Sequence, residues 1–193
     1  MEYVTTRELE AGLDEVRRSP KDIGVVRMIV RRPEVDAREV LEEGELSVAE
    51  GLVGDTWRTR RSSRTADGSA HPEMQLNIMN SRAIALLARE ADRWPLAGDQ
   101  LYVDLDLSGA NLPPGTRLAL GSAVIAVTSE PHTGCKKFMA RFGIDALRLV
   151  SSPEGRQLNL RGINAKVIQP GVVRVGDAVR KLDSRPLSGA DDV

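Results

Sequence analysis

Cysteine and histidine are scarce in this chain of 193 residues, which has one Cys and two His. A single thiol cannot form a disulfide within the chain, which fits a reducing cytosol. One Cys and two His without close spacing do not make a zinc site. The chain also lacks a long apolar run, and its first residues, MEYV, lack a signal-peptide pattern. The sequence therefore predicts a cytoplasmic protein with no membrane segment.

An excess of charge of either sign is lacking too, since 27 Lys and Arg face 28 Asp and Glu, for a formal net charge of −1. A balanced chain has no overall attraction to nucleic acid or to an anionic membrane, so any recognition of an anion has to be local. With 41% hydrophobic and 28% charged residues, the composition is that of a globular protein. At this length we expect one domain with a sizeable core.

Short segments rich in Val and Ile dominate the chain and predict strands. The first begins at Ile23 and ends at Pro33, and Gly, Pro, Asn and Asp separate those that follow. Further strands are expected at 38–49, 74–79, 100–107, 116–120, 123–129, 157–161, 164–168 and 172–180. Many short strands at such spacing favour a closed or nearly closed barrel. The predicted fold class is mostly β, a β-barrel with peripheral helices.

Helical patterns interrupt the strands. Residues 5–18 begin with a Thr cap and place Leu9, Leu13 and Val16 on one face. The other helices are expected at 81–94, 133–143 and 144–153. We therefore divide the chain into an N-terminal helical extension, a barrel domain and a flexible polar tail, at residues 1–20, 21–183 and 184–193.

Cys135 is the first candidate for chemistry, because it follows a predicted strand and lies in the first turn of a predicted helix. Thr133 is expected to cap that helix, and Lys136 and Lys137 follow the thiol directly. Unpaired N–H groups at the helix start, the helix dipole and the two lysines all favour a thiolate. A thiolate acts as a nucleophile or as a soft metal ligand.

A structural role for the same residue is the alternative. Cys135, Phe138, Met139 and Phe142 fall on one helical face, and these two phenylalanines are the only ones in the chain. A cysteine buried in such a stripe behaves as a small hydrophobe.

Two further segments carry polar residues that can line a site. In residues 51–64, GLVGDTWRTRRSSR, Asp55 can fix a turn, and Arg58 is the first of four arginines interleaved with hydroxyls. Such a group grips a phosphate bidentately, although a solvated loop is the alternative. Near the end of the chain, Arg161 and Asn164 flank a glycine between two strands and can point into the mouth of a barrel.

These segments together resemble the MOSC domain, which is named for the C-terminal domain of molybdenum-cofactor sulfurase. The resemblance rests on GLVGD at 51–55, the strand leading to Cys135 and two lysines, and RGINAKVIQPGVVRVGD at 161–177, in that order. It extends from about Val25 to Leu182.

The resemblance implies a barrel related to that of pyruvate kinase, with the lone cysteine facing a cleft. In members that bind the pterin molybdenum cofactor (molybdopterin), this cysteine ligates molybdenum and basic side chains hold the cofactor phosphate. Such members reduce N-hydroxylated substrates with electrons from partner proteins, and other members have been proposed to carry sulfur as a persulfide. Pyridoxal phosphate binding is also associated with the family. Cys135 carries over as catalytic residue and metal ligand, and the cofactor-binding candidates are Asp55, Arg58, Asp104, Lys136, Arg161 and Asn164.

The chain departs from the family pattern at three places. Thr56 and Trp57 follow the Gly-Asp turn where a basic residue and His are frequent, and Asp104 is the nearest polar residue where an Asn usually follows Gly98-Asp99. His132 stands before the cysteine, where Pro-Arg-x-Pro-Cys is common. We expect His132 to tune the thiolate or to donate a proton.

Three functions follow as hypotheses. The first is a molybdenum-dependent oxidoreductase that reduces N-hydroxylated small molecules and receives electrons from a donor protein. The second is a sulfur carrier that takes sulfur from a cysteine desulfurase onto Cys135. The third is a binding barrel without chemistry. In each case an exposed barrel edge or the N-terminal helix can support a homodimer.

Overall fold

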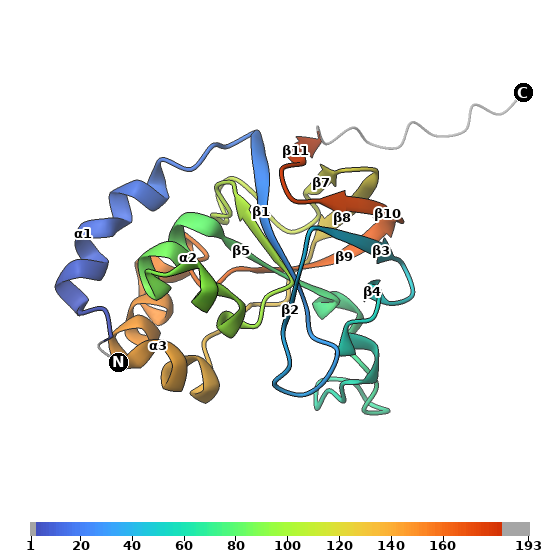
Figure 1. Ribbon diagram of the computed structural model, residues 1–193, viewed down its shortest axis with the longest axis horizontal. Coiled ribbons are helices and arrows are strands. Elements are labelled where there is room, and N and C mark those ends of the chain that lie inside the picture. The colour runs from blue at the N-terminus through green and yellow to red at the C-terminus, as the bar shows by residue number, and fades with distance from the viewer. Residues whose placement is uncertain (1–2, 183–193) are drawn as a thin grey trace, which may run out of the picture.

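Seven strands close into a barrel in the computed structural model, which describes residues 3–182 (Figure 1). The strands follow one another around the barrel in the order β1 (Ile23–Arg31), β11 (Ala178–Leu182), β7 (Arg117–Leu120), β8 (Ala123–Val127), β9 (Ile163–Gln169), β5 (Leu76–Asn80) and β6 (Leu101–Asp104). Strand β1 pairs with both β6 and β11 and so closes the barrel. Strands β5 and β6 pair in parallel, and the other neighbours are antiparallel. The fold class predicted from the sequence is confirmed.

Four short strands lie outside this ring. Strand β2 (Glu39–Leu41) pairs with the end of β1, while β10 (Gly171–Arg174), β3 (Glu43–Ser47) and β4 (Gly51–Leu52) form a second sheet. The strand predicted at 38–49 is thus two strands. The strand predicted at 172–180 is also two, because a turn at Gly176, with φ of 91°, separates them.

Side chains alternate between the inside and the outside of the barrel, as the period of a strand requires. On β6, Leu101 and Val103 point into the barrel core, whereas Tyr102 belongs to a second apolar cluster between barrel and helices. The Tyr102 hydroxyl donates a hydrogen bond to the Trp94 carbonyl. Both faces of the strand are therefore buried.

The helices gather on one side of the barrel (Figure 1). They are α1 (Thr6–Arg17), α2 (Ser81–Ala88), α3 (Lys136–Ser151) and α4 (Pro153–Gln157), with 3₁₀ turns at Thr56–Thr59, Pro72–Met74 and Ala91–Ala97. The Thr5 hydroxyl and the Glu8 carboxylate form the capping box of α1, which confirms the cap expected there. Among the described residues, no helix is long and apolar enough to cross a membrane.

Two local predictions are wrong, and a third is untested. Residues 157–161 do not form a strand, because the Ser152 hydroxyl and Pro153 start α4, and Asn159, with φ of 48°, turns the chain after it. The helix predicted at 81–94 ends at Ala88 and gives way to a 3₁₀ turn. The tail predicted at 184–193 lies outside the described residues.

Candidate functional site

A pocket of about 460 Å³ opens beside the start of α3 and contains Cys135 in its wall. We call it the Cys135 pocket. Its lining is rich in cations and holds a single carboxylate, Asp36. The cationic side chains come from the end of β1, the loops after β1 and β4, α3 and the segment before β9, and they are Arg32, Arg38, Arg60, Arg64, Lys137, Arg141 and Arg161.

Cys135 is the N-cap residue of α3, so its thiol lies at the pocket wall and not inside the first helical turn. The thiol is exposed and caps no backbone group. Cys135, and not Thr133 as expected, occupies the cap position. Phe138 and Phe142 are buried against each other with ring centroids 4.9 Å apart. The cysteine does not join this aromatic pair in the core, so the structural alternative for its side chain is wrong.

Asn164 helps to fix the segment that leads to Cys135. Its side-chain amide donates to the Glu130 carbonyl at 3.0 Å, and its carbonyl oxygen accepts from the Asn77 amide at 2.6 Å. Asn164 is 1% exposed and is not part of the pocket lining. It therefore supports the wall from behind.

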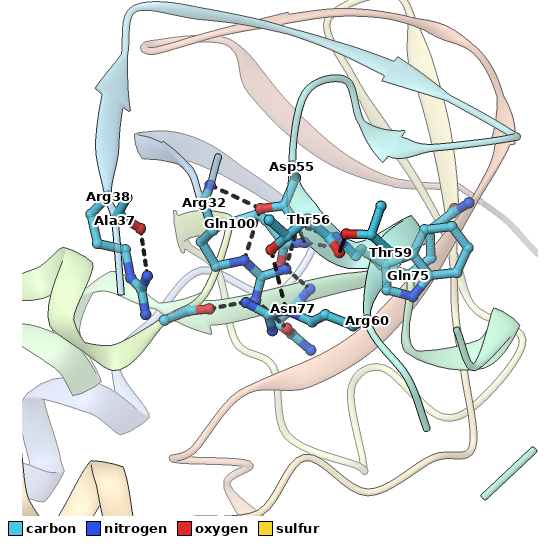
Figure 2. Close-up of polar contacts among 12 residues, drawn as sticks. Arg32, Ala37, Arg38, Asp55, Thr56, Thr59, Arg60, Gln75, Asn77 and Gln100 are labelled. Atoms are coloured by element: carbon cyan, nitrogen blue, oxygen red, sulfur yellow. Dashed lines mark hydrogen bonds and ion pairs between the residues drawn. The ribbon is translucent and has the colours of Figure 1, made fainter. Parts of the chain in front are cut away.

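Arg32 and Asp55 form a buried ion pair under the pocket floor (Figure 2). Two nitrogens of Arg32 donate to the two carboxylate oxygens, Nε to Oδ2 at 2.8 Å and Nη2 to Oδ1 at 2.7 Å. The remaining guanidinium nitrogen donates to Asn77 and to the Gly98 carbonyl. Asp55 also caps the 3₁₀ turn through the Trp57 N–H. The charges of Arg32 and Asp55 cancel each other within the protein. Asp55 itself does not line the pocket.

Arg161 and Asp99 form a second buried pair on another wall. The guanidinium donates to Asp99 Oδ2 at 2.7 Å and to the Ala97 carbonyl at 2.9 Å. It also lies over the Phe138 ring, 5.0 Å from the centroid. Asp99 is fully buried, so it balances the charge of Arg161 from inside the protein.

His132 lies beside this pair, with Nδ1 3.4 Å from Asp99 Oδ1. Burial, followed by the positive charge of Arg161, lowers the pKa of His132 to about 3. The imidazole is therefore neutral near pH 7. His132 Nδ1, Asp99 Oδ1 and Arg161 Nε are buried without a hydrogen-bond partner. Near pH 7 the ring therefore carries no imidazolium proton that it could donate.

Arg60 and Arg38 differ from the two buried arginines, because neither forms an ion pair with a carboxylate of the described residues. Arg60 Nε donates to the Thr56 hydroxyl, and Arg38 donates to the carbonyls of Pro95 and Ala37 (Figure 2). Desolvation, and then repulsion from Arg32, lower the pKa of Arg60 to about 10. Arg60 remains a cation near pH 7 in a setting that disfavours its charge. An anion bound in the pocket would relieve that repulsion.

Besides Asp55 and Asn164, three further residues expected at the site do not line the pocket. Arg58 is exposed and lies 3.5 Å from Glu50, Lys136 is exposed at the start of α3, and neither lines the pocket. Asp104 on β6 is paired with Arg82 at 2.7 Å and is likewise absent from the lining.

The sequence analysis missed Arg32, Arg38, Asp99 and Arg141. Arg32 ends a strand next to a proline, which is a weak signal of a buried cation. After Gly98-Asp99 the polar residue that matters is Gln100 and not Asp104, because the buried Gln100 side chain bonds the Asn77 N–H and reaches Asp55. This replaces Asp104 in the expectation drawn from the family pattern.

The chain is thus a closed β-barrel protein with an exposed cysteine at a basic pocket. Sequence comparison identifies the family to which it belongs. The family model of the MOSC domain matches residues 65–180, well over half of the chain. The chain belongs to the MOSC domain family. No curated protein matches it.

Solved structures agree on the fold. The chain is similar to the YuaD protein from Bacillus subtilis, with a TM-score of 0.61 and 17% identity over 81% of this chain and 94% of that one. It is also similar to YiiM from Escherichia coli, with a TM-score of 0.54 and 22% identity over 83% of this chain and 71% of that one. At such identities the likeness concerns the fold alone.

Proposed function

We propose that the chain binds the pterin molybdenum cofactor in the Cys135 pocket and acts in the reduction of N-hydroxylated compounds. The observation that carries the proposal is an exposed, uncapped thiol in the same pocket as two cationic side chains, Arg60 and Arg38, that form no ion pair with a carboxylate of the described residues. A soft thiolate suits molybdenum, and the unpaired guanidinium groups suit a phosphate.

The residues of the pocket fit this group in both charge and donor type. Cys135 would ligate the metal, while Arg60 and Arg38 would hold the phosphate. Arg32 and Arg161 keep their internal carboxylates and shape the walls. When bound, the cofactor supplies two-electron redox chemistry.

Reduction of an N–O bond consumes two electrons and two protons and releases water. We propose that a donor protein in the cytoplasm supplies the electrons. Water at the pocket mouth would supply the protons, because His132 is neutral near pH 7 and Asp36, the carboxylate of the lining, is ion-paired with Lys137 and Arg141. With a pKa lowered to about 3, His132 is a weak base near pH 7, so we assign it a place in the pocket wall beside Asp99 and not the role of proton donor.

The sulfur-carrier hypothesis is the second candidate, and the exposure of the Cys135 thiol favours it equally. A carrier receives sulfur from a cysteine desulfurase as a persulfide and needs no cofactor. The sulfur-carrier hypothesis does not explain why Arg60 and Arg38 form no ion pair with a carboxylate of the described residues, and we therefore rank it second. Pyridoxal phosphate would fit the same arginines, but Lys137, the lysine of the lining, is ion-paired with Asp36.

The test is the molybdenum and pterin content of the protein purified from cofactor-making cells. We expect near-stoichiometric molybdenum in the wild type, loss in Cys135→Ser, and reduced pterin in Arg60→Gln. Arg58→Gln is the matched control, because it removes the same charge two residues away and outside the pocket. Wild-type protein without molybdenum or pterin would overturn the proposal and leave persulfide transfer as the hypothesis to test.

A further inference from the structure

The mouth of the Cys135 pocket is bridged by an ion-pair cluster that belongs to the chain itself. Asp36 Oδ1 lies 3.0 Å from Lys137 Nζ and 3.2 Å from Arg141 Nη2. The two cations are four residues apart on α3, so they share one face of the helix. Asp36 reaches them from the loop between β1 and β2. All three side chains line the pocket that contains Cys135.

Asp36 lies in an exposed part of its loop. Val35, next to Asp36, is 84% exposed. Asp36 has a φ of 63°, the left-handed region that non-glycine residues enter at a cost. Its side-chain hydrogen bonds go to Lys137 and Arg141. The carboxylate therefore ties the loop to α3, while Arg38 ties the same loop to the Pro95 carbonyl.

The Asp36 carboxylate can be displaced. Lys137 and Asp36 are 63% and 58% exposed at their side chains, and ion pairs exposed to this degree are typically worth about 0–1 kcal/mol. One carboxylate faces two cations, so the cluster retains a positive charge. Arg141 is also held by the Leu96 carbonyl, which keeps its guanidinium in place when Asp36 leaves. When Asp36 leaves, a free anion can therefore bind to Lys137 and to an Arg141 side chain that is already in position.

We infer that Lys137 and Arg141 form a second anion subsite at the pocket mouth, that the Asp36 carboxylate fills it in the absence of ligand, and that the substrate carries a carboxylate or phosphate group. The part about the substrate rests on the proposed function. The subsite is centred on α3, whereas Arg60, assigned to the cofactor phosphate, caps the 3₁₀ turn after β4. Arg38, the other residue of that assignment, is near enough to interact electrostatically with Asp36 and Arg141. An N-hydroxylated compound with an anionic group would thus be held at Lys137 and Arg141, beside Cys135.

Alkylation of Cys135 tests the subsite without the cofactor. Iodoacetate carries a carboxylate and iodoacetamide is its neutral counterpart, so the ratio of their rates reports the charge at the pocket mouth. The full chain from cofactor-deficient cells is used, and mass spectrometry follows the one cysteine. We expect Asp36→Asn to raise the ratio roughly threefold, the effect of one unit charge several ångström away in wet surroundings. Lys137→Gln combined with Arg141→Gln is expected to lower the ratio.

The matched control is Asp67→Asn, which removes an exposed carboxylate outside the pocket lining. Asparagine tolerates the left-handed region, so Asp36→Asn keeps the loop conformation accessible. An Asp36→Asn ratio equal to that of the control would overturn the inference.

Protection experiments then identify the anion. Inorganic phosphate and acetate are compared as protectants of Cys135 against iodoacetamide, and the more effective one indicates the group that the substrate carries. Protection has to be stronger in Asp36→Asn than in the wild type and weaker in the Lys137 and Arg141 double variant, where Arg60 and Arg38 still offer cations to phosphate. Equal protection in all three would contradict the subsite. Because no molybdenum is present, this result stands or fails independently of the cofactor.

Discussion

Arg32 and Arg60 lie side by side at the same pocket and have opposite surroundings (Figure 2). Arg32 is 2% exposed and is bonded through one edge of its guanidinium, Nε and Nη2, to Asp55. Arg60 is exposed to the pocket, has a hydroxyl as its side-chain acceptor, and is repelled by Arg32. One arginine is part of the fold, and the other is available to a ligand.

The same division runs through the rest of the pocket. Arg161 has its own buried carboxylate in Asp99, whereas Arg38 donates to the backbone carbonyls of Pro95 and Ala37 and pairs with no carboxylate of residues 3–182. A count of basic residues thus overstates the capacity for anions, because each buried pair contributes nothing to the net charge. The partner of each guanidinium, and not its position in a basic run, separates structural cations from binding ones.

Breaking the buried pair has the largest expected effect. Asp55→Asn removes one charge and leaves Arg32 buried without compensation, which costs about 3–5 kcal/mol for a pair of this kind. At this chain length the cost corresponds to a fall in Tm on the order of 10 °C. Thermal unfolding followed by circular dichroism measures it. A double change, Arg32→Met with Asp55→Leu, should recover part of the loss, and a loss below 1 kcal/mol in Asp55→Asn would place Arg32 with the binding arginines.

The second prediction concerns the pH dependence of stability that His132 causes beside the buried pair of Arg161 and Asp99. His132 is neutral in the folded protein down to a pKa of about 3, while its ordinary value is 6.5. As the pH falls below 6.5, the unfolded chain binds a proton that the folded chain does not, so stability is lost. Between pH 6 and pH 4 the wild type should therefore lose up to about 1.4 kcal/mol more per pH unit than His132→Gln. Urea unfolding at each pH measures this, and parallel curves would show that His132 titrates normally in the fold.

The barrel was predictable from the sequence because it depends on short-range patterns. Val- and Ile-rich runs between turn residues mark strands wherever they stand. The pairing of β1 with β11 and β6 that closes the barrel joins distant segments and was not predicted. The strand predicted at 157–161 failed because Leu158 and Leu160 alternate over too short a stretch. Ser152 as N-cap and Pro153 as first residue instead start helix α4 just before this segment.

The site was predictable only where one residue carries the chemistry. Cys135 is unique in the chain, and Arg161 lies in a motif of the family. The partners of the arginines are far apart in sequence, with Asp55 23 residues from Arg32 and Asp99 62 residues from Arg161. Such pairs form only when β1, β6 and β9 are brought together around the barrel. The sequence therefore could not show which arginines of the run at 58–64 remain available.

The third prediction concerns Arg60→Gln. In contrast to Asp55→Asn, it should weaken anion binding and leave the stability of the fold nearly unchanged. Removing Arg60 relieves repulsion against Arg32 and breaks no ion pair, so the free energy of unfolding should not fall by more than about 0.5 kcal/mol. Binding of inorganic phosphate should weaken, and with it the stabilisation that excess ligand gives, which is on the order of 1 kcal/mol at ten times the Kd. Thermal shift with increasing phosphate measures both quantities. A destabilised variant that still responds to phosphate would assign Arg60 a structural role.

Arg58→Gln is expected to have the smallest effect, and it tests the boundary of the site. Arg58 and Arg60 belong to the same basic run and differ by two positions, yet only Arg60 lines the pocket. The pair of Arg58 with Glu50 is long, at 3.5 Å, and 65% and 41% exposed at its side chains, so its loss should change stability by less than about 0.5 kcal/mol. The thermal shift with phosphate should match the wild type within error. If instead Arg58→Gln weakens the phosphate response as much as Arg60→Gln does, the anion is held by the charge of the whole loop, and the contrast between paired and unpaired arginines would not explain binding.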